Sequence, residues 1–528
     1  MTLDGDAAIV LTTANGTVDF ASTVNADGAE GLTIRSGTGA VGFSGVIGGT
    51  GSLGALTINA TSDSQTGNAN ISIVDIGDSD TVGAAATNIG NANTNLITLS
   101  GTTFKHGAAV YTTKADDVIK LTRTAGAGNA TFTLANATLE FAGGNILLSN
   151  GVDLVANTGN KALTVLGVRG TSYEDVTLTT TGTLTVGTGG IGSGTQIEDV
   201  SLDGTSIVLK GNITTAGTTV GGTNNVGDVD FDGAVTIDGA ITITTDVSNS
   251  TVNDGKIDFD TNTINAEGSD TDSLTLTSGS GTITLGGAVG GNTGLSSLEV
   301  NATALNIAAN ITTADGLIDI NAPVTLTGAA VISSGSGGGN VDFSSTIGGG
   351  QNLDILSGSG NVIITGNIGA TALTSLDINQ SAGTGDITIS GKIGTADASG
   401  AGVTRIGNDG MTGTLTFGGI DYNTTGTQTY EADHIVMSGA DPDFKTDNDN
   451  ISFKDGGITL ATTSNLTVDT TDGAAGNILI EGAIAGTSGG GTTTVTLEAG
   501  SGSVSVAGMG TDIGNCLLYT SPSPRDCQ

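Results

Sequence analysis

The feature that most constrains the fold of this chain is a repeat that returns along its whole length. The segment Gly39–Ala60 aligns without a gap with Gly281–Ala302, and six apolar positions coincide in the two copies. Shorter copies begin at Gly360, at Gly385 and at Gly502. A repeat of this length indicates one structural unit that buries its apolar residues by stacking on the next unit.

Within each copy, apolar residues alternate with small polar ones over three to six positions, as in Leu274–Leu276. The tripeptide Val-Asp-Phe, or a near relative, recurs at Val18–Phe20, Val229–Phe231, Ile257–Phe259 and Val341–Phe343. A period of two, rich in β-branched residues and bounded by Gly, Asn and Asp, predicts short β-strands. A sustained helical period is nowhere visible.

Short strands at this spacing could also form a sandwich or a barrel, but three observations favour a parallel β-solenoid. The copies form one array over residues 1–515 with no linker of distinct composition. A Ser-Gly corner follows the strands that start at Leu32, Leu274 and Leu353, and aromatic residues, at 3%, are too few for sandwich cores. We therefore predict an all-β solenoid with irregular coils of roughly 20–25 residues, in which Gly, at 89 of 528 residues, forms the corners.

Charge excludes several partners. The chain has 52 acidic and 14 basic residues, for a formal net charge of −38. Nucleic-acid binding requires clustered Lys and Arg, so we expect no nucleic-acid partner. No apolar run approaches the roughly 20 residues that span a bilayer, so we expect no membrane insertion. The first residues also lack the basic and apolar regions of a signal peptide.

The last residues differ in composition from the rest of the chain, because both Cys lie there. Residues 516–526 resemble one translated reading frame of a transposon-end adapter used to prepare DNA-sequencing libraries. We interpret residues 516–528 as an artefact and expect them to be disordered. The repeat array then breaks off at Asn515 in the middle of a copy, and we expect the array to be truncated at both ends.

Two acidic clusters are weak candidates for calcium binding. Asp228, Asp230 and Asp232 have the spacing of the D-x-D-x-D-G loop, but its twelfth position is Gly239 instead of the bidentate Glu. The apolar residues between them continue the strand alternation, which favours an ordinary strand. The second cluster lies on a predicted loop and comprises Asp441, Asp443, Asp447 and Asp449. We predict no fixed metal site and no other cofactor.

The remaining motifs do not indicate catalysis. Gly37–Gly42 and Gly187–Gly192 match G-x-G-x-x-G, but no helix is expected after either, so a dinucleotide site is not predicted. His106 and His434 have no Cys or His partner at ligand spacing, and we expect both on loops or coil surfaces. Pairs of carboxylates are common in so acidic a chain and carry little glycosidase signal. We predict no catalytic residue.

The repeats resemble those of filamentous-haemagglutinin-like exoproteins and autotransporter-adhesin passengers. The resemblance lies in the Gly-x-Ile-x-Leu-x-Gly-x-Val-Gly units and in the phrase Gly426–Tyr430 followed by Ile435–Gly439. It covers nearly all of residues 1–515. It implies a right-handed parallel β-helix, an outer-membrane exporter, and a role in adhesion, biofilm or surface attachment.

We therefore expect the repeat region of a large secreted or cell-surface bacterial adhesin. Its partners would be a host or neighbouring-cell surface, a glycan or an extracellular matrix. A structural surface-layer or matrix protein is the first alternative. A β-helical polysaccharide lyase or hydrolase is less favoured, because the chain has no Trp to stack on sugars and few basic residues. Ice binding by Thr arrays is a further alternative, but the Thr spacing is irregular.

Overall fold

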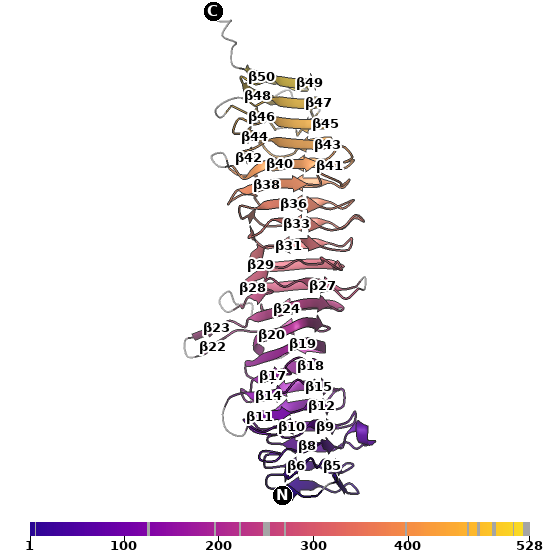
Figure 1. Cartoon of the computed structure of the whole chain (residues 1–528). Coiled ribbons are helices and arrows are strands. Elements are labelled where there is room, and N and C mark those ends of the chain that lie inside the picture. The colour runs from indigo at the N-terminus through magenta and orange to yellow at the C-terminus, as the bar shows by residue number, and fades with distance from the viewer. Residues whose placement is uncertain are drawn as a thin grey trace, which may run out of the picture. The chain divides into compact units, whose positions relative to one another are not determined.

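The protein is an all-β solenoid in the computed structural model (Figure 1). The structure describes residues 1–5, 7–123, 127–194, 197–220, 223–246, 254–268, 271–395, 399–461, 464–471, 476–487, 493–510 and 512–520. In these ranges the single helix is a 3-10 turn, η1 (Thr61–Asp63). The described residues accordingly contain no helix that is long and apolar enough to span a membrane.

The chain divides into two compact units, each of them a stack of coils. Unit 1 comprises Met1–Ser269 and Leu276–Thr282, and unit 2 comprises Asp270–Thr275 and Ile283–Gln528. The boundary falls within β28 (Ser273–Leu285), which contributes residues to both units. In each unit, a coil contains up to three main strands, and these strands pair in parallel with their equivalents in the neighbouring coils.

Unit 1 has three parallel sheets, called A, B and C here. The long strands β19 (Glu174–Ile191), β20 (Ile197–Leu209) and β24 (Val229–Ile237) continue from sheet C into sheet A. Sheet A also contains β2 (Ile9–Thr12), β5 (Leu32–Arg35), β7 (Leu56–Ile58), β9 (Ala86–Gly90), β12 (Ala108–Thr112), β15 (Leu139–Ala142), β18 (Leu163–Arg169) and β27 (Ile264–Ala266).

Sheet B contains β3 (Val18–Phe20), β6 (Val41–Phe43), β8 (Asn70–Ile73), β10 (Leu96–Leu99), β13 (Val118–Leu121), β16 (Asn145–Leu148), the C-terminal ends of β18 and β19, β21 (Ile213–Thr214) and β25 (Ala240–Thr244). Sheet C starts with β11 (Thr103–His106), β14 (Ala130–Leu134) and β17 (Leu154–Asn157), and ends with β26 (Ile257–Asp258). Two small pairs stand apart: β1 (Thr2–Leu3) with β4 (Asn25–Ala26), and the antiparallel β22 (Thr218–Val220) with β23 (Thr223–Asn225).

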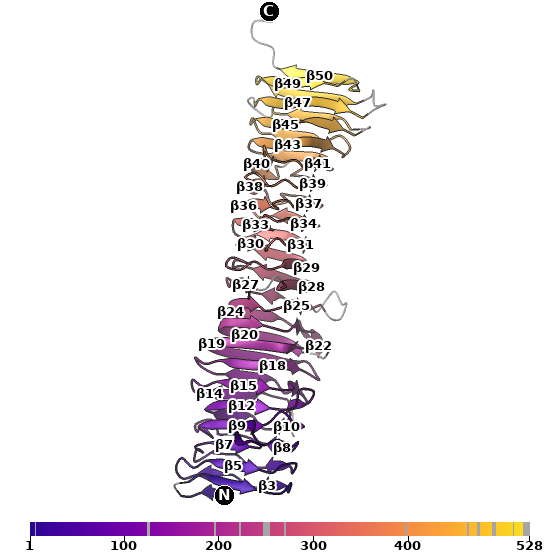
Figure 2. The same cartoon turned by 90° about the vertical axis from the view of Figure 1, so that its right-hand side faces the viewer.

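Unit 2 has three sheets as well, called D, E and F. Figure 2 shows strands of sheets D and F stacked along this unit. Sheet D contains β29 (Ser297–Ile307), β31 (Ile318–Asn321), β34 (Val341–Phe343), β37 (Val362–Ile364), β39 (Ile387–Ile389), β41 (Thr414–Phe417), β43 (Gln428–Met437), β45 (Ile451–Leu460), β47 (Ile478–Gly486) and β49 (Val504–Met509). Of these, β29 continues into sheet E, and the four strands β43, β45, β47 and β49 begin in sheet F.

Sheet E contains β32 (Val324–Leu326), β35 (Ile347–Gly348), β42 (Asp421–Thr424), β44 (Asp443–Thr446), β46 (Leu466–Asp469), β48 (Thr494–Gly500) and β50 (Asn515–Thr520). Sheet F contains β30 (Ile311–Thr312), β33 (Ala330–Ser333), β36 (Asn352–Leu356), β38 (Leu373–Ile378) and β40 (Ala401–Gly407). The prediction of a parallel β-solenoid is therefore confirmed in both units.

The coil length varies more than predicted. Register partners Leu298 and Ile318 lie 20 residues apart, whereas Leu56 and its partner Thr87 lie 31 apart. The longer coil holds extra residues at a corner, including η1. Individual coils exceed the predicted length of roughly 20–25 residues, because register is set by the inward-facing residues while surface corners accept insertions at little entropic cost.

Apolar residues at inward positions form columns that cross many coils. One column of unit 1 joins register partners Ile34, Ile58, Ile89, Tyr111, Phe141, Val165, Val186, Leu209, Ile237 and Ala266, all of which are buried. Aromatic rings stack in the same way, with centroids 4.5 Å apart for Phe231 and Phe259 and 4.6 Å apart for Tyr422 and Phe444. Each coil is therefore stabilised mainly by its two neighbours.

The predicted Ser-Gly corner recurs with the same hydrogen bonds in both units. In unit 1, the Asn59 amide of the next coil accepts from Ser36 N at 2.8 Å and donates to Ser36 Oγ at 2.7 Å. In unit 2, Asn379 makes the same bonds to Ser357, at 2.8 and 2.9 Å. Both Asn residues have positive φ angles, 45° and 50°, and all four polar side chains are buried. This corner satisfies the backbone where no sheet ladder does.

The expectation of disorder from Cys516 onward is wrong for residues 516–520. They belong to β50, which pairs in parallel with β48 from Asn515 to Thr520. The exposed edge of a parallel sheet offers unpaired N–H and C=O groups to any extended segment, so this pairing says nothing about the origin of the segment. Residues 521–528 lie outside the described residues.

Candidate functional site

Asp228, the first calcium candidate, belongs to a ladder of aspartates at one corner of unit 1. The carboxylate of each aspartate accepts the backbone N–H that begins the next coil. Asp153 accepts from Asp175 N at 3.0 Å, Asp175 from Asp199 N at 3.1 Å, and Asp199 from Asp228 N at 2.8 Å. Asp228 in turn accepts from Lys256 N at 2.9 Å. Asp228 therefore has a structural role as a corner acceptor.

The other two members of the first cluster have different neighbours. Asp230 on β24 forms an ion pair with Lys256 Nζ at 2.7 Å, and Lys256 also reaches Asp258 at 3.4 Å. Asp232 is exposed farther along the same strand. The strand separates the three carboxylates and assigns each to a different environment.

The members of the second cluster diverge in the same way. Asp441 Oδ1 accepts from Asn465 N at 2.9 Å, so Asp441 begins another corner ladder. Asp443 lies on β44, and Asp447 is exposed in the turn that follows this strand. Asp449 Oδ1 accepts from Thr427 Oγ1 at 3.5 Å. Within the described ranges, no group of three or more His, Cys, Asp or Glu side chains is arranged to hold a metal ion.

The corner ladders were not anticipated from the sequence, although a signal for them is present. Each of Asp153, Asp175, Asp199 and Asp228 is followed directly by the Leu or Val that opens a buried strand segment. An Asp or Asn side chain next to a strand start is well placed to accept a nearby N–H. Spacing alone did not reveal this role, because the acceptor and the donor lie one whole coil apart.

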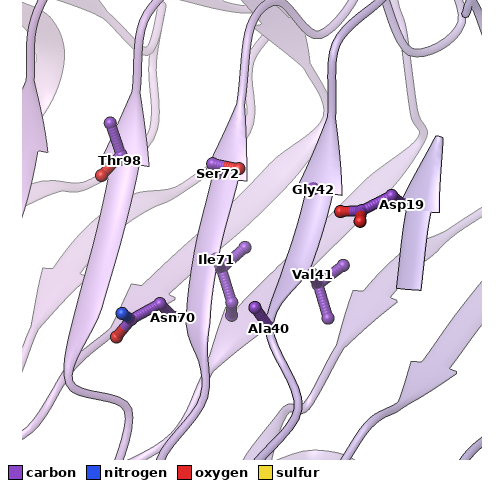
Figure 3. Close-up of a pocket in the computed structure, with 8 residues that line it drawn as sticks. All are labelled: Asp19, Ala40, Val41, Gly42, Asn70, Ile71, Ser72 and Thr98. Carbon is purple, nitrogen blue, oxygen red and sulfur yellow. The ribbon is translucent and has the colours of Figure 1, made fainter. Parts of the chain in front are cut away.

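A small polar notch lies on sheet B of unit 1 (Figure 3). Asp19, Gly42, Ser72 and Thr98 are successive register partners on β3, β6, β8 and β10. Gly42 has no side chain, so the outward row is interrupted there, and the space of about 110 Å³ is lined by the Asp19 carboxylate and the Ser72 and Thr98 side chains. The Asn70 side chain is also part of the lining.

A larger groove of about 420 Å³ crosses β19, β20 and β24 where these strands bend from sheet C to sheet A. Gly204 and Gly233 belong to its lining, and Asp203 and Asp232 are register partners beside them. Burial, and secondarily the charge of Asp232, raises the pKa of Asp203. The remaining lining residues are Thr180, Thr181, Thr205, Ala234 and Asn262. Such a lining offers hydrogen-bond donors and acceptors to a hydroxylated ligand.

The two histidines differ in environment. His434 is exposed on β43, as expected. The expectation for His106 is wrong, because it lies on β11 with its side chain buried in the coil interior. Its Nε2 lies 2.9 Å from Tyr111 Oη, and its Nδ1 lies 3.2 Å from the Gly107 carbonyl. A buried imidazole with polar partners fits an inward position, and the period-two pattern did not show which face this strand buries.

Both G-x-G-x-x-G stretches lead into or belong to strands, as expected. Gly37–Gly42 crosses the corner between β5 and β6, and Gly187–Gly192 lies at the end of β19. Neither precedes a helix, whose N-terminus would be needed to bind a pyrophosphate.

Comparisons with models of protein families, with curated proteins and with solved structures found no match.

Proposed function

We propose that this chain is the non-catalytic repeat region of a large secreted or cell-surface bacterial adhesin. It would attach to a host or neighbouring-cell surface, a glycan or an extracellular matrix through its coil faces. Export through an outer-membrane exporter is part of the proposal, and it is supported by the resemblance of the repeats to those of exported adhesins.

The observation that carries the proposal is the regular display of outward side chains. On sheet A, one outward column joins Val10, Thr33, Thr57, Asn88, Val110, Glu140, Thr164, Thr185, Val208, Thr236 and Asn265 as register partners. Seven of these eleven residues are Thr or Asn, and adjacent parallel strands place successive members of the column about 4.8 Å apart. Many weak polar contacts on one rigid surface add up to firm attachment through multivalency.

The groove between sheets C and A and the notch on sheet B support a hydroxylated ligand in particular. Both combine carboxylate and hydroxyl groups, and neither has an aromatic lining residue. Individual contacts of this kind are weak, so we expect low affinity at each site and strong dependence on repeated presentation.

The test is retention of the purified chain on immobilised glycans, matrix proteins and whole cells, measured by biolayer interferometry. Adhesion predicts retention that is lost when the chain is unfolded by heat. A variant with Thr57→Glu, Thr164→Glu and Thr185→Glu adds charge to the outward column of sheet A. A matched variant with Thr131→Glu, Thr133→Glu and Thr177→Glu adds the same charge to outward positions of sheet C and locates the binding face.

Two other outcomes would contradict adhesion. Self-assembly of the chain into sheets without retention on any surface would favour a structural surface-layer or matrix protein. Turnover of a polysaccharide that Asp203→Asn or Asp232→Asn abolishes would make the groove an active site, because stacked carboxylates can act as an acid and base pair.

A further inference from the structure

Pairs of aspartates occupy matching positions on adjacent coils of unit 2. These outward-facing register pairs are Asp319 with Asp342, Asp354 with Asp377, and Asp421 with Asp443. Register partners on neighbouring strands lie close enough for like charges to destabilise the contact. The coil stack therefore holds carboxylates together that the unfolded chain would separate.

In two of the pairs, a cation forms an ion pair with one member. Arg405 donates from Nε and Nη2 to Asp377, at 2.7 and 2.9 Å. Lys392 Nζ lies 2.6 Å from Asp421 Oδ2. The other member of each pair is Asp354 or Asp443, and burial raises the pKa of both residues.

Of these residues, Asp443 has the environment that is least favourable to a charged carboxylate. Its Oδ1 is buried and has no hydrogen-bond partner. On one side it faces Asp421 of β42, and on the other its register partner is Thr467 of β46. The other charges that act on it are those of Asp469 on β46, Lys445 on its own strand and Glu498 on β48. The charges of three carboxylates thus act on Asp443. Lys392 pairs with one of them, Asp421, and the ammonium of Lys445 on the same strand opposes their effect.

We propose that the contact around Asp443 is strengthened by acid, so that β42, β44 and β46 pack more firmly when Asp443 takes up a proton. The added proton comes from solvent, removes the negative charge and turns the carboxyl group into a hydrogen-bond donor toward neighbouring oxygens. The proposal does not depend on which ligand the protein binds, and it goes beyond the proposed adhesive function.

The direction of the effect follows from linkage. Burial first, then the charges of Asp469 and Asp421, raise the pKa of Asp443 from 3.8 to about 6. A carboxyl group with a raised pKa in the folded state binds its proton more tightly there than in the unfolded state. Local stability is therefore lowest above pH 6 and increases as the pH falls from about 7 to about 4. Acid usually destabilises proteins whose carboxylates are held in ion pairs. An increase in local stability on acidification therefore distinguishes the proposed effect of Asp443 from the usual one.

The test is hydrogen–deuterium exchange of the β42, β44 and β46 amides at several pH values, corrected for the intrinsic pH dependence of exchange. In the wild-type chain, we expect local opening to become about tenfold rarer between pH 7.5 and pH 5, because pH 5 lies about one unit below the pKa of Asp443 in the folded state and still above its value of 3.8 in the unfolded state. Asp443→Asn should show the slow exchange already at pH 7.5 and little further change. Asp447→Asn, in the exposed turn next to β44, is the matched control and should behave like the wild type.

Two results would overturn the proposal. One is wild-type protection of these strands that is flat or falls between pH 7.5 and pH 5. The other is faster exchange in Asp443→Asn than in the wild type at pH 7.5, with both chains folded by circular dichroism. The wild-type pH series decides the sign by itself, so the test stands even if the variant fails to fold.

Discussion

The buried imidazole of His106 makes the stability of the surrounding coils in unit 1 depend on pH. Its ring lies among Tyr111, Phe132 and the backbone of β11, with its centroid 5.9 Å from that of Tyr111 and 6.4 Å from that of Phe132. Burial lowers the pKa of His106 from 6.5 to about 4. The native coil therefore holds His106 neutral, whereas the unfolded chain charges it in mild acid.

We predict that acid destabilises the coils around β11. Because the pKa of His106 is lower in the folded state, stability is fully present above pH 6.5 and is lost as the pH falls from 6.5 toward 4. At pH 4.5 the loss amounts to about 2 to 3 kcal/mol. His106→Gln should remove this loss when unfolding in urea is compared at pH 7 and pH 4.5. His434→Gln, which changes the exposed histidine, should leave it in place, and an unchanged loss in His106→Gln would contradict the assignment.

Residue type alone did not distinguish these environments. Asp228 and Asp443 have the same side chain, yet one carboxylate accepts a backbone N–H and the other has a buried oxygen without a partner. The partners of Asp228 lie in the coils before and after it. Such roles depend on which residues the stacking brings together, and residues 20 to 31 positions apart carry no local signal of that.

At the scale of the element, the coil is defined by strands and by the corners between them. The strands were predictable, because Val41, Phe43, Leu56 and Ile58 are buried as their alternation indicates. The aligned positions of the second copy, in Gly281–Ala302, are buried as well. Corner lengths were not predictable, because an insertion at the surface leaves the inward pattern unchanged.

The corner that contains Gly39 tolerates no side chain. A Cβ atom at Gly39 would lie 2.2 Å from the carbonyl oxygen of Gly16 in the adjacent coil. At Gly16 itself, a Cβ atom would meet only the Thr13 side chain at an ordinary 3.5 Å. The two glycines thus occupy equivalent corners with different amounts of space.

We predict that Gly39→Ala forces β5 and β6 apart from the preceding coil and destabilises them by about 2 to 4 kcal/mol. Gly16→Ala should change stability by less than about 1 kcal/mol. Amide exchange of β2, β3, β5 and β6 measures both variants. Equal losses of stability in the two variants would show that the close approach of the adjacent coil's backbone does not exclude a side chain at Gly39.

At the scale of the whole molecule, net charge opposes folding. The formal charge of −38 is distributed over a chain whose basic residues number only 14. The ion pairs of Lys256, Lys392 and Arg405 each compensate the charge locally and lie at least partly in solvent. Most of the repulsion between carboxylates is therefore screened only by water and dissolved ions.

We predict that sodium chloride stabilises the protein. Raising the ionic strength from about 0.01 M to about 0.15 M shortens the Debye length from roughly 30 Å to 8 Å and should raise the unfolding midpoint by a few degrees. Differential scanning calorimetry at pH 7.5 measures the shift, and a neutral osmolality control with sucrose separates screening from solvent exclusion. A fall in the midpoint with salt would mean that ion pairs outweigh repulsion.

The sequence by itself determined the class of fold. Its alternation of apolar and polar residues, its internal repeats and its abundant glycine are compatible with few architectures other than stacked coils of short strands. The tertiary structure alone decided the coil boundaries, the inward position of His106, the corner ladder through Asp228 and the stacked pair Asp421 and Asp443. The physical reason is that burial pattern is local along a strand, whereas hydrogen bonds and charge contacts between coils depend on register, which each corner length resets.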